Sequence, residues 1–556
     1  MATPLRKPTQ ASGLRSSLNS EESSPAHGPP SRRRSDAGST RGPQLRKQAS
    51  ASSLRSEGQA WCRRSESIPE PDPILLSLVQ ALAHTGIPLS EAGFFEALIT
   101  RPLGVRRSLP SMAQLHRSVL PALRRRHKSG LRQVLHRRDT FVFLHEATTG
   151  DGRAILGISV LPLDRPGQSP LLLGMEFLEQ LSHHSVARAV TGVLSEGHVL
   201  SHRVLAVVTS GNAHMIQAFA ANGILGTVLP TALHIPCLAH QLELVMELWP
   251  DKLERLVSVL HLLEDTFGRQ AALRHRYELF LRERGLALSL PVPSRWTGPE
   301  AWLEKASVIA EHLPILMEFV AADEEEGAAM AKLQALLGSG SEELVAEATF
   351  AAEHGAVLLS TAQFLHKLGE PLAHRVYGEL EALRIGFSYH LDTGFGPNTR
   401  RQLALCPPRL ASQFREVLAC SLTRLEHMLS SHPAVPTLKA VRALDPKQVG
   451  AVGWSQLQQE QAIPGLAEVA EVEWFRYQQL AQAAPANVSL SQWWEAQSEQ
   501  LPTLSALAQR YLWLPLSMPK SPFLPGDVLS GAGVEEGFTD ECVCLWCMLR
   551  YNRNLC

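Results

Sequence analysis

The pattern of apolar and polar positions predicts strands in the middle of the chain and helices on either side of them. Short apolar runs bounded by glycine, proline or aspartate predict three consecutive strands at 140–149, 152–163 and 169–179. A further strand is predicted at 204–210, and the run at 232–249 is typical of a strand that continues into a helix. Predicted helices at 182–196 and about 212–221 separate these runs. Three strands followed by alternating helices and strands indicate an α/β fold.

Helical spacing dominates the segments before and after this region. Ile74, Leu75, Leu78 and Leu82 fall on one helical face, and Gly86 is placed to end that helix. Leu115, Val119 and Leu123 also recur at helical spacing with arginines between them, which predicts a helix that packs on one face and presents charge on the other. Residues 251–500 follow helical periodicity almost throughout.

The first 70 residues have a different composition. They contain 15 serines, many prolines and glycines, and almost no apolar periodicity, so we predict a disordered tail. Ser35 in "SRRRS" and Ser50 in "RKQAS" follow basic residues, the arrangement that basic-directed kinases favour, and are candidate phosphorylation sites. The tail is interpreted either as a regulated nuclear-import or nucleic-acid segment or as a simple solvated tail.

The net charge of −1 conceals a strong asymmetry along the chain. Residues 1–70 carry 12 Arg/Lys against 6 Asp/Glu, and residues 101–138 carry 11 Arg/Lys and no acid. These stretches sum to +17, so the remainder carries −18. Concentrated basic charge favours an anionic partner, most often nucleic acid, whereas the alternative is docking onto the chain's own acidic surplus. The candidate nucleic-acid-binding residues are Arg106, Arg107, Arg117, Arg124, Arg125, Arg126, Lys128 and Arg132.

Cysteine usage and hydropathy predict the compartment. Eight cysteines in 556 residues, only Cys62 of them before residue 237, do not form a disulfide framework. The N-terminus is polar and arginine-rich, and no apolar run approaches the roughly 18 residues of a membrane span. We therefore expect a soluble intracellular protein with reduced thiols, no membrane association, no cofactor and no small-molecule substrate.

Five stretches in order carry a resemblance to a known family. They are "FVFLHEATTGDGRAILGISVL", "VVTSGNAHMIQAF", "HIPCLAHQLELV", "PSRWTG" and "WWEAQSEQLPTLSALAQRYLWLPLSMP", which together cover most of residues 140–556. This order and spacing resemble the hAT-superfamily transposases. The earlier "ILLSLVQALAHTGIPLSEAGFFEALI" and "SLPSMAQLHRSVLP" are similar to the segment that follows the zinc finger in the CGG triplet repeat-binding protein family, which is related to hAT elements.

The resemblance implies an RNase H-like α/β core, interrupted by a large all-helical insertion and completed by a C-terminal dimerisation region. The small helical module and the disordered N-terminal tail precede it. The expected organisation is a basic Ser/Arg/Pro-rich tail at 1–70, a basic helical module at 71–138, the first part of the core at 139–250, the insertion at 251–490 and the dimerisation region at 491–556.

Three acidic residues hold two divalent metal ions in active hAT enzymes, and this chain departs from that pattern. Glu146 in "LHEAT" stands where the resemblance implies the first aspartate, and Ser210 stands where it implies the second. Ser521 falls near the position of the third acid, although a shifted alignment would offer Asp527 or Glu535. We therefore expect no nuclease or transposase activity and no bound metal.

Two other family elements have alternative interpretations. Cys237 and His240 match a C-x-x-H element, but two ligands do not complete a structural zinc site, so a structural role is favoured over metal binding. Trp296 in "SRWTG" matches an Arg-Trp pair that contacts DNA in an active relative, and we favour packing in this chain.

The C-terminal part of the chain is rich in aromatic and cysteine residues. The resemblance implies that the region at 493–515 dimerises, with Trp493, Trp494, Leu507, Tyr511 and Trp513 as candidate contacts, although part of it must complete the core. The closing cysteines are interpreted as small apolar residues of a buried helix, with zinc binding as the alternative; they are Cys542, Cys544, Cys547 and Cys556.

The expected function follows from these residues and from one absence. Only Cys62 lies in the region where the relatives carry a Cys/His zinc finger, so sequence-specific DNA binding is not expected. We predict a catalytically inactive, transposase-derived nuclear protein that forms a homodimer and acts in transcriptional regulation. It is expected to bind nucleic acid with low sequence specificity or to bind chromatin proteins. The alternative is a self-associating protein-interaction scaffold that does not bind nucleic acid.

Overall fold

The computed structural model describes residues 71–87, 89, 111–149, 151–286, 299–322, 328–338, 340–367, 369–485, 487–519, 521 and 539–555. The predicted tail at 1–70 lies outside these residues, and so do Ser35 and Ser50. Where the structure describes the chain, none of its helices has both the length and the apolar character that a membrane span requires.

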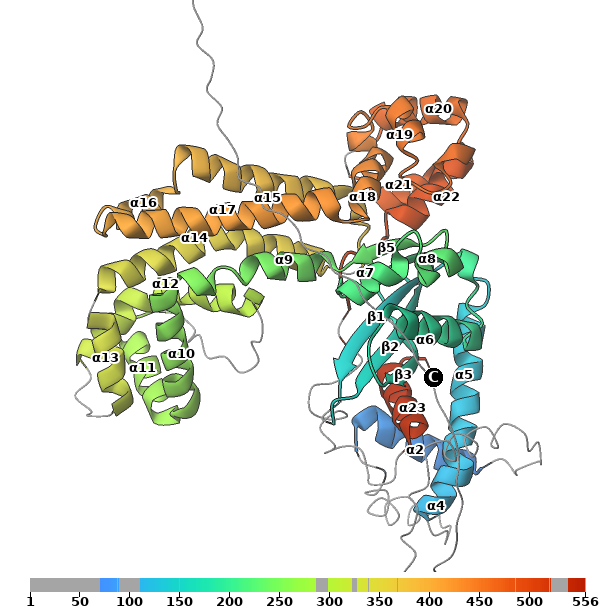
Figure 1. The fold of residues 1–556 in the computed structure, drawn as a ribbon, viewed down its shortest axis with the longest axis horizontal. Coiled ribbons are helices and arrows are strands. Elements are labelled where there is room, and N and C mark those ends of the chain that lie inside the picture. Colours follow the sequence, from blue (N-terminus) through green and yellow to red (C-terminus); the bar gives the residue numbers. More distant parts are fainter. Residues whose placement is uncertain are drawn as a thin grey trace, which may run out of the picture. The chain divides into compact units, whose positions relative to one another are not determined.

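A single five-stranded sheet forms the centre of the α/β part (Figure 1). Its strands are β1 (Thr140–Thr148), β2 (Ala154–Pro162), β3 (Leu171–Leu178), β4 (Val204–Thr209) and β5 (Leu233–Pro236). They lie in the order β3-β2-β1-β4-β5. Strand β2 is antiparallel to β1 and β3, whereas β1, β4 and β5 run parallel. All five strands begin and end within about two residues of the apolar runs that predicted them, except that β5 fills only the start of its run.

Alternation along β1 divides the interior into two cores. Phe141 and Phe143 point to one face of the sheet, where they join helix α9 (Leu238–Met246) and the helices that follow. Val142 and Leu144 point to the opposite face, which is covered by α6 (His183–Glu196) and α7 (Ala213–Phe219). A period of two residues places successive side chains on opposite faces, so positions 141–144 of β1 are all apolar because both faces are buried there.

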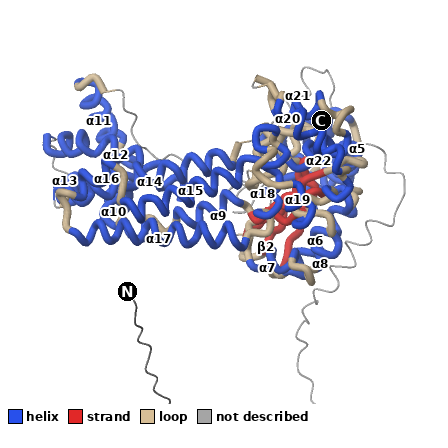
Figure 2. Tube along the Cα trace, turned by 90° about the horizontal axis from the view of Figure 1, so that it is seen from above, coloured by secondary structure: helices blue, strands red, loops and turns tan. Residues whose placement is uncertain are grey.

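A long helical region follows the sheet, as the periodicity predicts (Figure 2). One continuous apolar core joins it to the Phe141 face of the sheet. Its helices are α10 (Glu254–Arg269), α11 (Ala271–Glu283), α12 (Pro299–Ala322), α13 (Ala328–Gly338), α14 (Ser341–Leu365), α15 (Ala373–Thr393), α16 (Pro397–Leu403), α17 (Pro408–Ser431), α18 (Val435–Val441), α19 (Trp454–Glu460), α20 (Glu471–Gln482), α21 (Leu490–Ala496) and α22 (Pro502–Tyr511).

The N-terminal helical module and the C-terminal helix pack together. The module contains α2 (Pro73–Thr85), which Gly86 ends with a φ of 75°, and α5 (Leu120–Leu135), which continues from a π-helical turn at Leu115–Val119. Helix α23 (Asp540–Tyr551) inserts Leu545, Trp546 and Leu549 among the apolar side chains of this module. Its other side, with Val543 and Met548, packs against the sheet, so residues from both ends of the described chain share one layer.

The candidate dimerisation residues are buried inside the chain. Trp493, Trp494, Leu507 and Tyr511 are at most 5% exposed and belong to the core that joins the helices to the sheet, and Trp513 is partly buried against it. The Trp494 indole N–H donates to the Leu444 carbonyl at 2.8 Å. In this conformation these aromatic side chains complete the fold of one chain and leave little surface for a second copy.

Candidate functional site

Glu146 and Ser210 meet where strands β1 and β4 end. The register of the parallel pair aligns Phe143 with Val208, so Glu146, three residues further along β1, lies opposite the turn that follows β4. The Glu146 side chain is 11% exposed. The carboxyl ends of adjacent parallel strands are the usual position of functional sites in open α/β sheets, so this edge of the sheet is a candidate site.

Three side chains from the turn and from α7 bond the Glu146 carboxylate. The Ser210 hydroxyl donates to Oε2 at 2.5 Å, and the Asn212 amide nitrogen donates to the same oxygen at 2.7 Å. The His214 ring nitrogen Nε2 contacts the other oxygen, Oε1. The negative charge is therefore surrounded by donors that come from a stretch of five residues.

The local backbone explains why this stretch can reach back to β1. Gly211 adopts a φ of 83°, a left-handed conformation that glycine adopts without steric cost, and it turns the chain away from β4. Asn212 is the N-cap residue of α7, yet its side chain makes no capping hydrogen bond because its amide is directed to Glu146. His214 follows in the first turn of α7 on the same side.

The arrangement neutralises a carboxylate and does not activate a nucleophile. The Ser210 hydroxyl proton points to Glu146, and His214 also bonds Glu146, so in the described structure no serine–histidine hydrogen bond forms between these two residues. A serine nucleophile needs a base that accepts its proton and is itself oriented by a third group. The hydrogen bonds seen here hold the turn against β1.

The two-metal site implied by the hAT resemblance does not fit these residues. Such a site needs carboxylates that face one another, and Ser210 offers a hydroxyl that already donates to the first acid. Within the described ranges, no three His, Cys, Asp or Glu side chains gather as a metal-binding group. Ser521 is exposed, and Asp527 and Glu535 lie outside the described residues.

The Cys237–His240 pair has a structural role in this conformation. Cys237 is buried at the N-cap of α9, and its sulfur accepts hydrogen bonds from the backbone N–H groups of His240 at 3.4 Å and Met518 at 3.2 Å. The His240 ring bonds Glu243 at 3.1 Å. Burial raises the pKa of the Cys237 thiol, so the sulfur stays protonated and attaches the segment around Met518 to α9. Trp296 lies outside the described residues.

The C-terminal cysteines lie along α23, where the sequence predicted a buried helix. Cys547 is buried, and burial raises the pKa of its thiol to about 12. Burial likewise raises the pKa of the Cys544 thiol to about 11. Cys542 contacts a ring nitrogen of His116 at 3.6 Å, and Cys556 lies outside the described residues.

Part of the basic segment is neutralised by acids of the same chain. Arg124 pairs with Glu541 of α23 at 2.6 Å, and Lys128 pairs with Glu196 at the end of α6. Arg132 donates to the Glu196 backbone carbonyl at 3.1 and 3.2 Å. Arg124 and Lys128 therefore pair with acids of the same chain, as the alternative interpretation of the sequence has it, whereas Arg132 contacts a backbone carbonyl.

Arg138 at the end of this segment also pairs with an acid, Asp164, at 2.6 Å, whereas four other described arginines face solvent. Arg117, Arg125, Arg126 and Arg137 are exposed, and in the part of the chain that the structure describes none of them forms an ion pair. Arg125 and Arg126 lie on the side of α5 away from its buried positions Leu131 and Leu135. Arg106 and Arg107 lie outside the described residues. The positive surface is therefore narrower than the sequence suggests.

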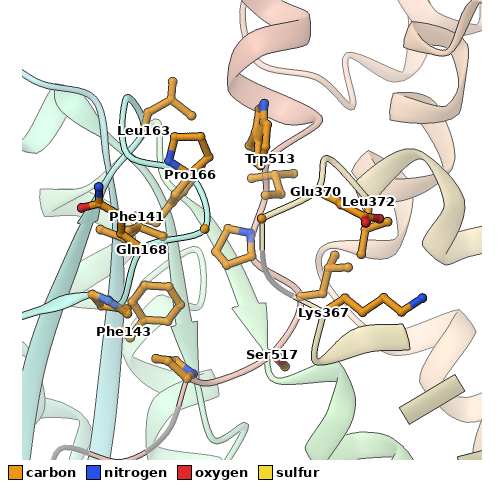
Figure 3. A pocket seen from close by; sticks show the side chains of 18 of the residues that line it. Phe141, Phe143, Leu163, Pro166, Gln168, Lys367, Glu370, Leu372, Trp513 and Ser517 are labelled. Carbon is orange, nitrogen blue, oxygen red and sulfur yellow. The ribbon is translucent and has the colours of Figure 1, made fainter. Parts of the chain in front are cut away.

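A cleft between the sheet and the helical region is the other candidate site (Figure 3). Phe141 and Phe143 of β1 line one wall, and Trp513 lines another. Gly167 and Gly369 approach so closely that a Cβ atom on Gly167 would lie 2.8 Å from the Gly369 Cα. The walls are mostly apolar, so the cleft is a packing boundary between two parts of the core.

Asn212 and His214 are the residues that sequence reasoning missed. Both stand within the quoted "VVTSGNAHMIQAF", but their polar character alone fits an ordinary turn and helix start. The signal was the position of Asn212 at the start of the predicted helix, two residues after Ser210. The direction of its side chain depends on the strand register.

Comparison with known proteins adds no family to this description. No protein-family model matches the chain, and no curated protein matches it.

Proposed function

We propose that this chain is a catalytically inactive, hAT-derived protein with an RNase H-like core, and that it acts in the nucleus as a DNA- or chromatin-associated factor in transcriptional regulation. A five-stranded sheet in which only β2 runs antiparallel is the arrangement expected of such a core. The helical region between β5 and the segment at 514–519 is consistent with an insertion into the α/β core. The segment at 514–519 returns to the end of β5, where it forms hydrogen bonds with Cys237 and Leu238.

The observation that carries the proposal is the hydrogen-bonded Glu146. In a two-metal nuclease, carboxylates at these strand ends hold cations that activate water. Here Ser210, Asn212 and His214 donate to the single acid and supply the compensation that a metal would supply in an active enzyme. This edge of the sheet is where the hAT resemblance implies a catalytic site, but the hydrogen bonds to Glu146 stabilise the fold. We therefore propose that the chain has no enzymatic activity.

The exposed arginines support association with nucleic acid. Arg125 and Arg126 project from a helix that carries no acid, and Arg117 lies about two turns before them. Contacts of this kind neutralise phosphates and do not select bases, so binding should depend strongly on salt and weakly on sequence. This agrees with the single cysteine, Cys62, among residues 1–70 of the sequence.

The test compares two variants that lose the same charge. Arg125→Gln/Arg126→Gln removes two solvent-facing cations, and Arg124→Gln/Lys128→Gln removes two cations that pair with Glu541 and Glu196. The slope of log affinity against log salt for duplex DNA should fall by about 1.8 in the first variant, since each neutralised phosphate contributes roughly 0.9. The second variant should change the slope less. Equal slopes in the parent and the first variant would refute phosphate binding by α5.

The alternative, a self-associating scaffold without nucleic-acid binding, is favoured by one surface. Val472 and Phe475 on α20 are 79% and 52% exposed and lie three residues apart, on one side of the helix. Since Trp493 and its neighbours are buried within the chain, α20 is the more accessible apolar surface near the predicted dimerisation region. Sedimentation of the full chain tests this alternative: a dimer that Val472→Ser/Phe475→Ser converts to a monomer, together with no DNA binding at low salt, would favour the scaffold.

A further inference from the structure

Ser129 lies on the exposed side of the basic helix. It is exposed in α5, one helical turn after Arg125 and Arg126 and one turn before Arg132. Its hydroxyl makes no hydrogen bond within the described part of the chain. By contrast, the Ser118 hydroxyl of the preceding turn donates to the Gln114 carbonyl at 2.8 Å. Ser129 is therefore a helical serine whose hydroxyl is free to react.

The residues before Ser129 form a recognition sequence for basic-directed protein kinases. In "RRRHKS", Arg126 stands three positions and Arg124 five positions before the serine. Arginine at both positions is a more complete pattern than the basic residues before Ser35 or Ser50. Exposure, an unpaired hydroxyl and this spacing are three separate properties that coincide at one residue.

We infer that Ser129 is a phosphorylation site whose modification releases nucleic acid from α5; the release, though not the modification, rests on the function proposed above. A basic-directed protein kinase would transfer the γ-phosphoryl group of ATP to the Ser129 Oγ. A new Oγ–P bond forms, the bond between the γ-phosphorus and its bridging oxygen breaks, the hydroxyl proton is released and ADP leaves.

The phosphate acts through the same cations that contact DNA. A phosphoserine carries about −1.5 to −2 charges at neutral pH and accepts charge-assisted hydrogen bonds from arginine. Arg125 and Arg126 are one turn away, so the phosphate competes directly with DNA phosphates for their guanidinium groups. The surface loses its positive charge at the centre of the proposed contact.

Access by a kinase requires local opening of α5, because kinases bind their substrates in an extended conformation. Gly130 follows Ser129 directly and makes this the weakest part of the helix. An added Cβ on Gly130 meets only the Leu555 Cδ2 atom at 3.8 Å, an ordinary contact. Gly130→Ala should therefore strengthen the helix without a clash and slow phosphorylation of Ser129 by about fivefold.

The first measurement maps phosphate on the full-length chain after incubation with a basic-directed kinase and ATP. Mass spectrometry should find phosphate on Ser129 in the wild type, less in Gly130→Ala and none in Ser129→Ala. The tail serines Ser35 and Ser50 serve as an internal control for kinase activity. Their modification without any phosphate on Ser129 would overturn the inference.

The second measurement compares duplex DNA binding by Ser129→Asp and the near-isosteric Ser129→Asn. The aspartate should weaken binding by about tenfold, and more at low salt, whereas the asparagine should leave it unchanged. If both variants bind like the wild type while Arg125→Gln/Arg126→Gln weakens binding, the inferred release of DNA by phosphorylation is overturned and the DNA contact stands. If Arg125→Gln/Arg126→Gln also binds normally, the proposed DNA contact fails, and phosphate on Ser129 is then judged by the mapping alone.

Discussion

At the scale of single residues, Glu146 shows what the sequence predicts about a site and what it does not. The hAT resemblance paired Glu146 with Ser210, and the structure places both at one edge of the sheet. The contributions of Asn212 and His214 were not predictable, because they depend on the left-handed turn at Gly211 and on the offset between β1 and β4. Composition shows which donors are present, and geometry decides which acid they reach.

Ser210→Asp tests this local account. It replaces a hydroxyl that donates to Glu146 at 2.5 Å with a second carboxylate, so a hydrogen bond becomes a repulsion between like charges. We expect the free energy of unfolding at pH 7 to fall by about 1–3 kcal/mol. Ser210→Asn, which keeps a donor, should lose less. Equal stability of the two variants at pH 7 would contradict the proposed contact.

At the scale of elements, α23 shows the limit of periodicity. The sequence indicated a buried closing helix, which the structure confirms, but apolar spacing cannot identify the surface that buries it. The family resemblance implied a second copy of the chain, whereas α23 packs within one chain between the N-terminal module and β3. Strand positions were easier to predict, since strands with both faces buried are continuous apolar runs with polar residues at their ends.

The Asn552 side chain connects α23 to the edge of the sheet. Its amide accepts from the Leu172 N–H at 2.7 Å, donates to the Leu172 carbonyl at 2.8 Å and contacts the His127 ring at 2.9 Å. These bonds satisfy the free backbone groups of an edge strand in a buried setting, because Asn552 is 1% exposed.

We expect Asn552→Ala to lower the free energy of unfolding by about 2–4 kcal/mol, since buried polar groups of Leu172 and His127 lose their partners. The exposed Asn554 is the matched control, and Asn554→Ala should change stability by less than about 0.5 kcal/mol. Urea denaturation of both variants measures the difference. A small effect of Asn552→Ala would mean that α23 does not hold the strand edge in solution.

At the scale of the whole molecule, charge and burial set the response to pH. Desolvation lowers the pKa of His145 and His234 to about 3, and that of His127 and His354 to about 4. These rings are neutral in the folded chain and regain a pKa near 6.5 on unfolding. Their contribution to stability is therefore fully present above about pH 6.5 and is lost as the pH falls toward 4. Burial raises the pKa of Glu347 to about 7, and this acid acts in the opposite sense, since its contribution is lost as the pH rises from 4.5 to 7.

Chemical denaturation across this pH range should show that the free energy of unfolding falls as the pH falls, because the four histidines have the larger effect. Between pH 6.5 and 5 each of these histidines lowers the free energy of unfolding by up to about 1.4 kcal/mol per pH unit, so the four rings outweigh the Glu347 carboxyl. His234→Gln keeps a partner for the Thr209 hydroxyl, which contacts the His234 ring at 3.0 Å. This variant should take up about one proton fewer on unfolding, so its free energy of unfolding should depend less steeply on pH. Stability that is independent of pH below 6.5 would show that these rings are not buried as the fold requires.

The fold-level prediction from sequence was accurate where one pattern extends over many residues, and the functional prediction now depends on one edge of the sheet. The most direct test is the effect of Mn²⁺ on thermal unfolding of the full chain and of Glu146→Gln. If Ser210, Asn212 and His214 have replaced a catalytic metal site, millimolar Mn²⁺ should not raise the unfolding temperature of the wild type more than that of Glu146→Gln. Neither protein should cleave DNA. A rise in the wild-type midpoint that Glu146→Gln abolishes, or Mn²⁺-dependent DNA nicking that the same substitution removes, would identify Glu146 as a metal ligand and contradict the proposed inactive site.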